Sequence, residues 1–179
     1  MERKIILYIA MTLDGYIADL NDGLSFLDEY ESVQSIKDRF EELMNQVDTL
    51  IMGRSTYEIM RGFSNDWPYT NHQTYVLTNK KLEDTDCIHF ISSSIPDLIF
   101  DLKKTPGKDI WLVGGGITIK PFIEMNLIDL YQITIIPKLL GTGKRLFHEH
   151  TKPIDLVLDH TEYLGELLLQ TYQRKTAKI

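Results

Sequence analysis

The chain has 179 residues, of which 43% are hydrophobic and 25% charged, as in a single globular domain and unlike a disordered, collagenous or coiled-coil chain. Its 19 Lys and Arg against 26 Asp and Glu give a net charge of −7, which disfavours nucleic acids and anionic membranes as partners, since both require a basic face. The single cysteine, Cys87, excludes an intramolecular disulfide and a multi-cysteine zinc site. No apolar run approaches the about 18 residues of a membrane span, so we expect a cytoplasmic protein.

The first half of the chain is predicted to alternate strands and helices. Residues 5–10 form a continuous apolar run rich in β-branched side chains, which is typical of a central strand buried on both faces. Apolar residues recur at about 3.6 spacing over residues 32–46 and predict a helix, with Ser32 as a candidate N-cap. A second buried strand over residues 48–53 ends in glycine and leads into a helix over residues 54–60.

The second half continues the alternation and then changes its pattern. Two apolar segments at the end of the chain are joined at Leu164-Gly165 and predict an antiparallel hairpin. The elements expected in this half are strands over 74–79, 87–92, 109–113, 130–136, 155–163 and 166–174, and helices over 96–104 and 117–125. We therefore predict one α/β domain over residues 1–179, with a mixed, mostly parallel central sheet flanked by helices and a C-terminal antiparallel hairpin.

Glycine stands at two of the predicted strand-to-helix junctions, at Gly53 and at Gly114–Gly116. Glycine lets a backbone approach a ligand closely, and the N-terminus of the following helix offers free N–H groups at the positive end of its dipole. Both junctions are therefore candidate phosphate-binding sites in a chain that has no net basic surface. The alternative is that these glycines only make tight turns.

Two further segments carry groups that suit an anion. Arg54 opens the helix after Gly53, where a cation opposes the helix dipole unless an anionic ligand is bound. Thr78–Asn79, followed by two lysines, offers a hydroxyl, an amide and ammonium groups that suit a ribose 2′-phosphate. A solvated arginine and a polar turn are the alternatives.

Named nucleotide and metal motifs are missing. Gly114–Ile119 lacks the last glycine of G-x-G-x-x-G, and Gly141–Arg145 matches a P-loop only in its final glycine and lysine. The five histidines show no spacing that predicts a metal site, so we expect no metal.

Carboxylates are the candidate acids and bases. Asp14 follows the first strand, and α/β sheets bind their ligands at the carboxyl ends of strands, although Asp-Gly is also a common turn dipeptide. Asp28, Glu29 and Glu31 lie near the start of the next helix, where they could hold a substrate amidine or complement the helix dipole.

Five segments of the chain together resemble the dihydrofolate reductase-like superfamily. Within it, the chain is most similar to the reductase domain of the bifunctional riboflavin-biosynthesis deaminase–reductase. The segments are Ala10–Ala18, Leu50–Glu58, Val76–Thr78, Val113–Gly116 and Ile136–Phe147. They occur in the family's order and cover nearly the whole chain, without a deaminase half.

The resemblance implies that the chain binds NADPH, and it assigns residues by position. Ala10 and Ile17 would border the nicotinamide. The remaining cofactor-binding residues would be Gly53, Arg54, Ser55 and Thr56 for phosphates, Leu77, Thr78 and Asn79 for the adenosine side with its 2′-phosphate, and Gly115, Gly116, Ile117 and Thr118 for the pyrophosphate. Several of these are the anion sites marked above from the residues alone.

The resemblance implies an NADPH-dependent reductase that transfers a hydride to a C=N or C=O group of a small heterocycle, as in 5-amino-6-(5-phosphoribosylamino)uracil reductase. Asp14 would orient or protonate the substrate through water, with Glu31 or Asp28 in reserve. Tyr8 and Gly114 depart from that reductase, which usually has lysine and glutamate there. A dihydrofolate reductase-type pterin reductase and a non-catalytic NADPH-binding protein are the alternatives. A homodimer could form through the C-terminal hairpin.

Overall fold

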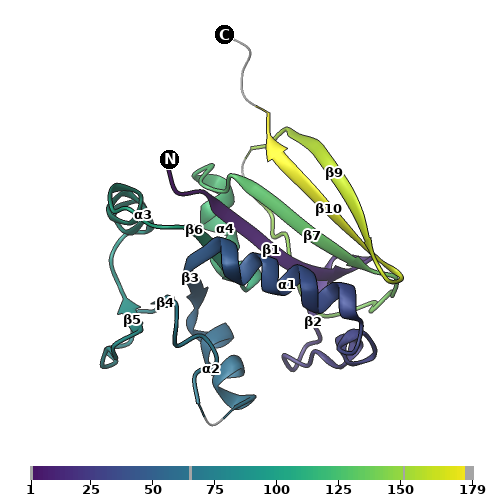
Figure 1. Ribbon diagram of the computed structural model, residues 1–179, viewed down its shortest axis with the longest axis horizontal. Helices are drawn as coiled ribbons and strands as arrows, with labels where there is room; N and C mark the ends of the chain where they lie inside the picture. The colour runs from purple at the N-terminus through teal and green to yellow at the C-terminus, as the bar shows by residue number, and fades with distance from the viewer. Residues whose placement is uncertain (1, 65, 151, 176–179) are drawn as a thin grey trace.

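The computed structural model describes residues 2–64, 66–150 and 152–175, and its central feature is an eight-stranded sheet flanked by helices (Figure 1). The strand order is β5-β4-β3-β6-β1-β7-β10-β9, in which neighbours from β5 to β7 are parallel and those from β7 to β9 antiparallel. These strands are β1 (Ile5–Thr12), β3 (Val47–Gly53), β4 (Gln73–Leu77), β5 (Ile88–Ile91), β6 (Asp109–Gly114), β7 (Leu130–Ile136), β9 (Leu156–Leu164) and β10 (Leu167–Arg174). The predicted mixed, mostly parallel sheet with a C-terminal antiparallel hairpin is confirmed.

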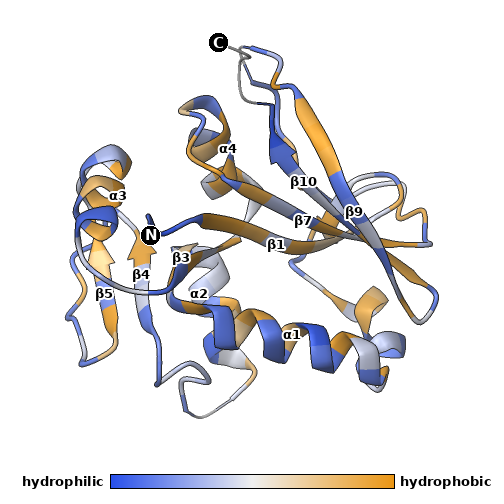
Figure 2. Ribbon diagram, turned by 45° about the horizontal axis from the view of Figure 1, so that its top comes forward, coloured by the Kyte–Doolittle hydropathy of each residue, from blue (hydrophilic) through white to orange (hydrophobic). Residues whose placement is uncertain are grey.

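The helices cover both faces of this sheet, because its central strands are apolar on both faces (Figure 2). On β1, Ile5 and Leu7 pack towards one face and Ile6 towards the other, and all three are fully buried. The helices are η1 (Ser25–Tyr30, a 3-10 helix), α1 (Gln34–Gln46), α2 (Arg54–Gly62), α3 (Ile95–Lys104) and α4 (Gly116–Glu124). Helices α3 and α4 pack on the side of Ile5, and α1 and α2 on the side of Ile6.

The boundaries of the helices depart slightly from the prediction. Helix α1 begins at Gln34 with Val33 at its N-cap position, and no side chain caps it, so the assignment of Ser32 as N-cap is wrong. Helix α3 is capped as such helices usually are, because Ser94 accepts a hydrogen bond from the Asp97 backbone N–H. Within the described part of the chain, no helix combines the length and the hydrophobicity that a bilayer crossing requires.

A second, two-stranded sheet was not predicted. It pairs β2 (Tyr16–Ala18) with β8 (Lys144–Arg145), and Tyr16 lies opposite Arg145. The strands have three and two residues, which is too short for a periodicity signal, and their pairing depends on contacts between distant parts of the chain. This small sheet holds the segment after β1 against the loop that follows β7.

Candidate functional site

The chain reverses its direction across the sheet between β3 and β6. After β3 it moves outward through β4 to β5, and then returns to insert β6 between β3 and β1. Met52, next to the last residue of β3, lies opposite Gly114, the last residue of β6. In open α/β sheets, ligands bind outside the carboxyl ends of strands at such a reversal, so both predicted glycine junctions lie at the position where a ligand is expected.

The glycines bring the starts of α2 and α4 together. A side chain at Gly53 would overlap Thr118 Oγ1. A Cβ atom at Gly115 would lie 3.6 Å from Thr56 Oγ1 and 3.9 Å from Ile17 Cδ1. Five residues predicted to bind the cofactor, far apart in the sequence, are thus neighbours in space.

The N-termini of both helices are open to a ligand. Gly53 and Gly115 are the N-cap residues of α2 and α4, and neither helix has a side-chain hydrogen bond at its cap. In the first turn of α4 the Thr118 N–H already donates to the Gly115 carbonyl at 2.9 Å. The other first-turn N–H groups of the two helices lie in one region, which is an arrangement that binds anions. Gly114 has a φ of +127°, which L side chains rarely adopt, so the backbone favours glycine there.

Side chains of the first helical turns remain available at this site. Ser55 is exposed, and Ile117 is 80% exposed. Gly116 packs against the Arg145 carbonyl, and a Cβ atom there would lie 2.8 Å from the His148 ring Nε2. His148 was not predicted as a site residue, because no local pattern links it to Gly116.

Arg54 has a partner of its own in this structure. Its guanidinium pairs with the Glu58 carboxylate one turn along α2, and its side chain is 32% exposed. An i,i+4 pair on an exposed helix face is weak, so the guanidinium can exchange this partner for a ligand. The role of Arg54 towards an anion stays a prediction.

The turn after β4 lies beside the start of α2. Leu77, the last residue of β4, is the register partner of Gly53, which places Thr78 and Asn79 just beyond the carboxyl edge of the sheet. The predicted strand over 74–79 therefore ends two residues early. The Thr78 backbone N–H donates to the Ile91 carbonyl, and its Oγ1 accepts a hydrogen bond from the Lys80 backbone N–H.

An aromatic cluster lies on the α1 side of β1 and β6. Tyr8 and Ala10 are two residues apart in β1, so both side chains face this side of the sheet. Trp111 packs edge-on against Tyr8 and Phe40, with ring centroids 6.4 Å and 5.7 Å apart, and its Nε1 donates to the Tyr8 carbonyl at 3.0 Å. Burial raises the pKa of the Tyr8 phenol, so this group stays protonated.

Asp14 fastens a loop. Its carboxylate accepts hydrogen bonds from the Thr12 hydroxyl and from the backbone N–H groups of Leu140 and Gly141, at 3.1 Å and 2.7 Å for the last two. The Thr12 hydroxyl bond is the largest cause that lowers the pKa of Asp14 to about 2. A carboxylate held in this way is suited to positioning the loop after β7 and poorly suited to donating a proton.

The acidic residues near α1 all point to solvent. Asp28, Glu29 and Glu31 are exposed, in and just after η1. The one charged side chain buried on α1 is basic, Arg39. Within the described ranges, no acidic side chain on the inner face of α1 is placed to hold a substrate amidine.

The described residues include no group of three or more His, Cys, Asp or Glu side chains that could hold a metal ion.

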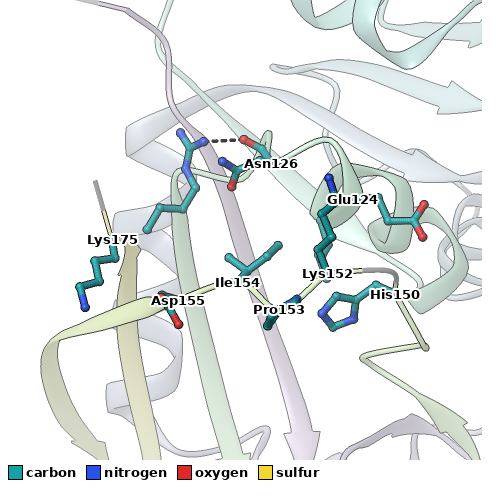
Figure 3. Close-up of a pocket in the computed structure, with 10 residues that line it drawn as sticks. Glu124, Asn126, His150, Lys152, Pro153, Ile154, Asp155 and Lys175 are labelled. Carbon is teal, nitrogen blue, oxygen red and sulfur yellow. Dashed lines mark hydrogen bonds between the residues drawn. The ribbon is translucent and has the colours of Figure 1, made fainter. Parts of the chain in front are cut away.

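The chain has a pocket of about 310 Å³ away from the glycine junctions, between the end of α4 and the end of β10 (Figure 3). Lys152, Lys175, Glu124 and Asp155 mix both charges around it, and it includes none of the predicted site residues.

Comparison with solved structures defines the class of fold. The chain superimposes on dihydrofolate reductase from Enterococcus faecalis, solved with NADP(H), with a TM-score of 0.71 over 98% of this chain and 100% of the other, at 18% identity. The predicted dihydrofolate reductase-like fold is thereby confirmed.

Closer relatives define the family. Residues 3–169 match the RibD C-terminal domain. The chain is 36% identical over 175 residues to the uncharacterized protein YwjB of Bacillus subtilis (strain 168), covering 97% of this chain and 99% of YwjB. A putative riboflavin biosynthesis protein from Shewanella sp. PV-4 has a TM-score of 0.88 and 34% identity, over 98% of this chain and 100% of that one. The chain belongs to the RibD C-terminal domain family, as the five sequence segments predicted.

Proposed function

We propose that the protein is an NADPH-dependent reductase of small heterocyclic substrates. The observation that carries this proposal is the convergence of two glycine-capped helix N-termini at the carboxyl ends of β3 and β6. An acidic chain can bind a dinucleotide there, because backbone N–H groups and helix dipoles supply the positive potential without many cations. Membership of a reductase domain family supports the same conclusion.

The residues at the two helix starts fit the parts of the cofactor. The N–H groups of α2 and α4 would bind the diphosphate, with the Thr56 and Thr118 hydroxyls beside them. Arg54, Thr78 and Asn79 would receive the 2′-phosphate, and their charge and donors suit it. When bound, NADPH supplies the hydride from its C4 atom.

At the end of the site where the substrate would bind, Ala10 and Ile17 would border the nicotinamide ring of the cofactor. Asp14 would act as a positioning residue, since its carboxylate fastens the loop at Leu140 and Gly141 to the turn after β1. Glu31 is exposed and remains the reserve candidate for moving a proton through water.

The function is tested by measuring NADPH binding and NADPH oxidation with two acceptors. Turnover of 5-amino-6-(5-phosphoribosylamino)uracil would support the riboflavin-type reaction, and turnover of dihydrofolate the pterin reductase. Cofactor binding without turnover of either, or of a wider panel of heterocycles with C=N and C=O groups, would favour a non-catalytic NADPH-binding protein. Absence of NADPH binding would contradict the proposal.

We also propose that the protein forms a homodimer through the outer hairpin. One end of the edge strand β9 is hydrophobic (Figure 2). Leu156, Val157 and Leu158 are consecutive in this strand and are 37%, 50% and 50% exposed. An exposed apolar edge strand is a template for pairing with another chain. Light scattering should give a dimer that Leu158→Asp converts to a monomer; a monomeric wild type would contradict this.

A further inference from the structure

Helix α1 carries a buried arginine, Arg39, on the side that faces Tyr8 of β1. The Arg39 side chain is 10% exposed, and its guanidinium lies 5.8 Å from the centre of the Tyr8 ring. Within the described part of the chain, one of its five N–H donors has a hydrogen bond, at 3.3 Å to the Glu42 carboxylate. Glu162 is 3.9 Å away, and both carboxylates reach into solvent. A buried guanidinium with distant, solvated counter-charges retains donors for a further acceptor.

Two buried polar side chains continue this cluster across the sheet. Tyr8 on β1 lies opposite Gln132 on β7, which lies opposite Thr171 on β10, so all three side chains face α1. Gln132 is 5% and Thr171 3% exposed. Gln132 Oε1 and Thr171 Oγ1 have no hydrogen-bond partner in the described part of the chain. Buried polar atoms are almost always hydrogen-bonded. Two unpartnered polar atoms on neighbouring strands therefore indicate that a ligand group binds beside them.

The cluster adjoins the substrate side of the candidate site. Tyr8 and Ala10 project from the same face of β1, and Ala10 is expected to border the nicotinamide. The groups assembled next to it are a guanidinium, a carboxamide, a hydroxyl and a phenol. Arg39 can only donate hydrogen bonds, the unpartnered Gln132 Oε1 can only accept them, and the two hydroxyl groups can do either. The carboxylates nearby, Glu42 and Glu162, lie on the solvent side of Arg39.

We propose that Arg39, Gln132, Thr171 and Tyr8 form a binding site for a ring edge of the substrate in which a carbonyl oxygen adjoins an N–H group. The carbonyl oxygen would accept from Arg39, and the N–H would donate to the unpartnered Gln132 Oε1. A ring that presents an amidine to the protein is disfavoured, because a donor edge would face the Arg39 guanidinium. The assignment of this group to the substrate rests on the proposed reductase function, whereas the binding site itself does not.

The test uses two ring probes that differ in this edge, 2,4-dioxopteridine and 2,4-diaminopteridine. Binding is followed by the fluorescence of Trp111, which packs on Tyr8, with and without NADPH. We expect the dioxo ring to bind at least about tenfold more tightly than the diamino ring, as for one charge-assisted hydrogen bond gained.

Three variants assign the effect to the cluster. Arg39→Met should weaken binding of the dioxo ring at least about tenfold. Thr171→Val keeps the shape and removes an unpartnered hydroxyl, so it should leave the thermal midpoint unchanged or higher while weakening binding of the probe. Lys37→Met removes a cation from the exposed side of the same helix and should have no effect.

The outcomes separate this inference from the reductase proposal. The inference would be overturned if the diamino ring binds more tightly than the dioxo ring, or if neither probe binds. It would also be overturned if Arg39→Met and Thr171→Val both bind the dioxo ring as tightly as the wild type does. Arg39-dependent binding of the dioxo ring by a protein that does not bind NADPH would retain the binding site and reject the reductase.

Discussion

Gly115→Ala should affect the stability of the fold and the binding of NADPH in different ways. The new methyl group would lie 3.6 Å from Thr56 Oγ1 and 3.9 Å from Ile17 Cδ1, which are ordinary contact distances. The residue has a φ of −77°, which alanine adopts readily. We therefore expect the free energy of unfolding to stay the same or rise by up to about 1 kcal/mol, since alanine restricts the unfolded chain.

The cofactor should respond in the opposite way. The methyl group would stand between the starts of α2 and α4, where the diphosphate is proposed to lie. Losing one charge-assisted hydrogen bond costs about 1.5–3 kcal/mol, which corresponds to a roughly 10- to 150-fold weaker Kd. The assay is a titration with NADPH followed by quenching of Trp67 and Trp111, the two tryptophans.

Gly62→Ala is the matched control for this experiment. Gly62 ends α2, and a Cβ atom there would have no neighbour within 4 Å. The same change of residue should therefore leave the Kd for NADPH unaltered. If Gly115→Ala binds NADPH within about twofold of the wild type, the proposed position of the diphosphate is refuted.

Three other predictions concern the loop, the core and the packing of α4. The pKa of Asp14 is lowered to about 2 in the folded protein, so its stabilising contribution is present above about pH 4 and is lost as the pH falls towards 2. The free energy of unfolding of Asp14→Asn should therefore be lower than that of the wild type above about pH 4, and the two values should converge as the pH approaches 2. Arg3, 6% exposed, donates to Asp48 and to the Lys108 and Leu102 carbonyls, so Arg3→Met should cost on the order of 3 kcal/mol in urea unfolding, and a cost below about 1 kcal/mol would contradict a structural role. Gly116→Ala would bring a methyl group against the Arg145 carbonyl and the His148 ring, so its thermal midpoint should fall, unlike that of Gly115→Ala.

Hydrophobic runs and turn residues were sufficient to predict the sheet. The burial of Ile5 to Leu7 on both faces follows from an uninterrupted apolar run, and the glycines at 53 and 114–116 marked the carboxyl ends of β3 and β6. The element boundaries shifted by one or two residues, as at Leu77, because hydrogen bonding ends a strand where the pattern of residues does not change.

Contacts between distant residues could not be predicted from local patterns. The pairing of Tyr16 with Arg145 and the packing of His148 on Gly116 join segments more than 30 residues apart. Asp14 was predicted to act on the substrate, which stays a prediction; besides the nearby Thr12 hydroxyl, its hydrogen-bond partners lie in the loop at 140–141, which no spacing rule connects to it. Arg39 likewise resembles any polar residue of an amphipathic helix until its burial is known.

A comparison of NADPH with NADH tests the central claim most directly. The two cofactors differ in the 2′-phosphate that Arg54, Thr78 and Asn79 are proposed to receive, while both would use the helix starts at Gly53 and Gly115. Titrations of the wild-type protein at one ionic strength should show tight binding of NADPH and at least about tenfold weaker binding of NADH. Equal affinity would contradict the assignment of the 2′-phosphate site, and absence of binding by both cofactors would contradict the account as a whole.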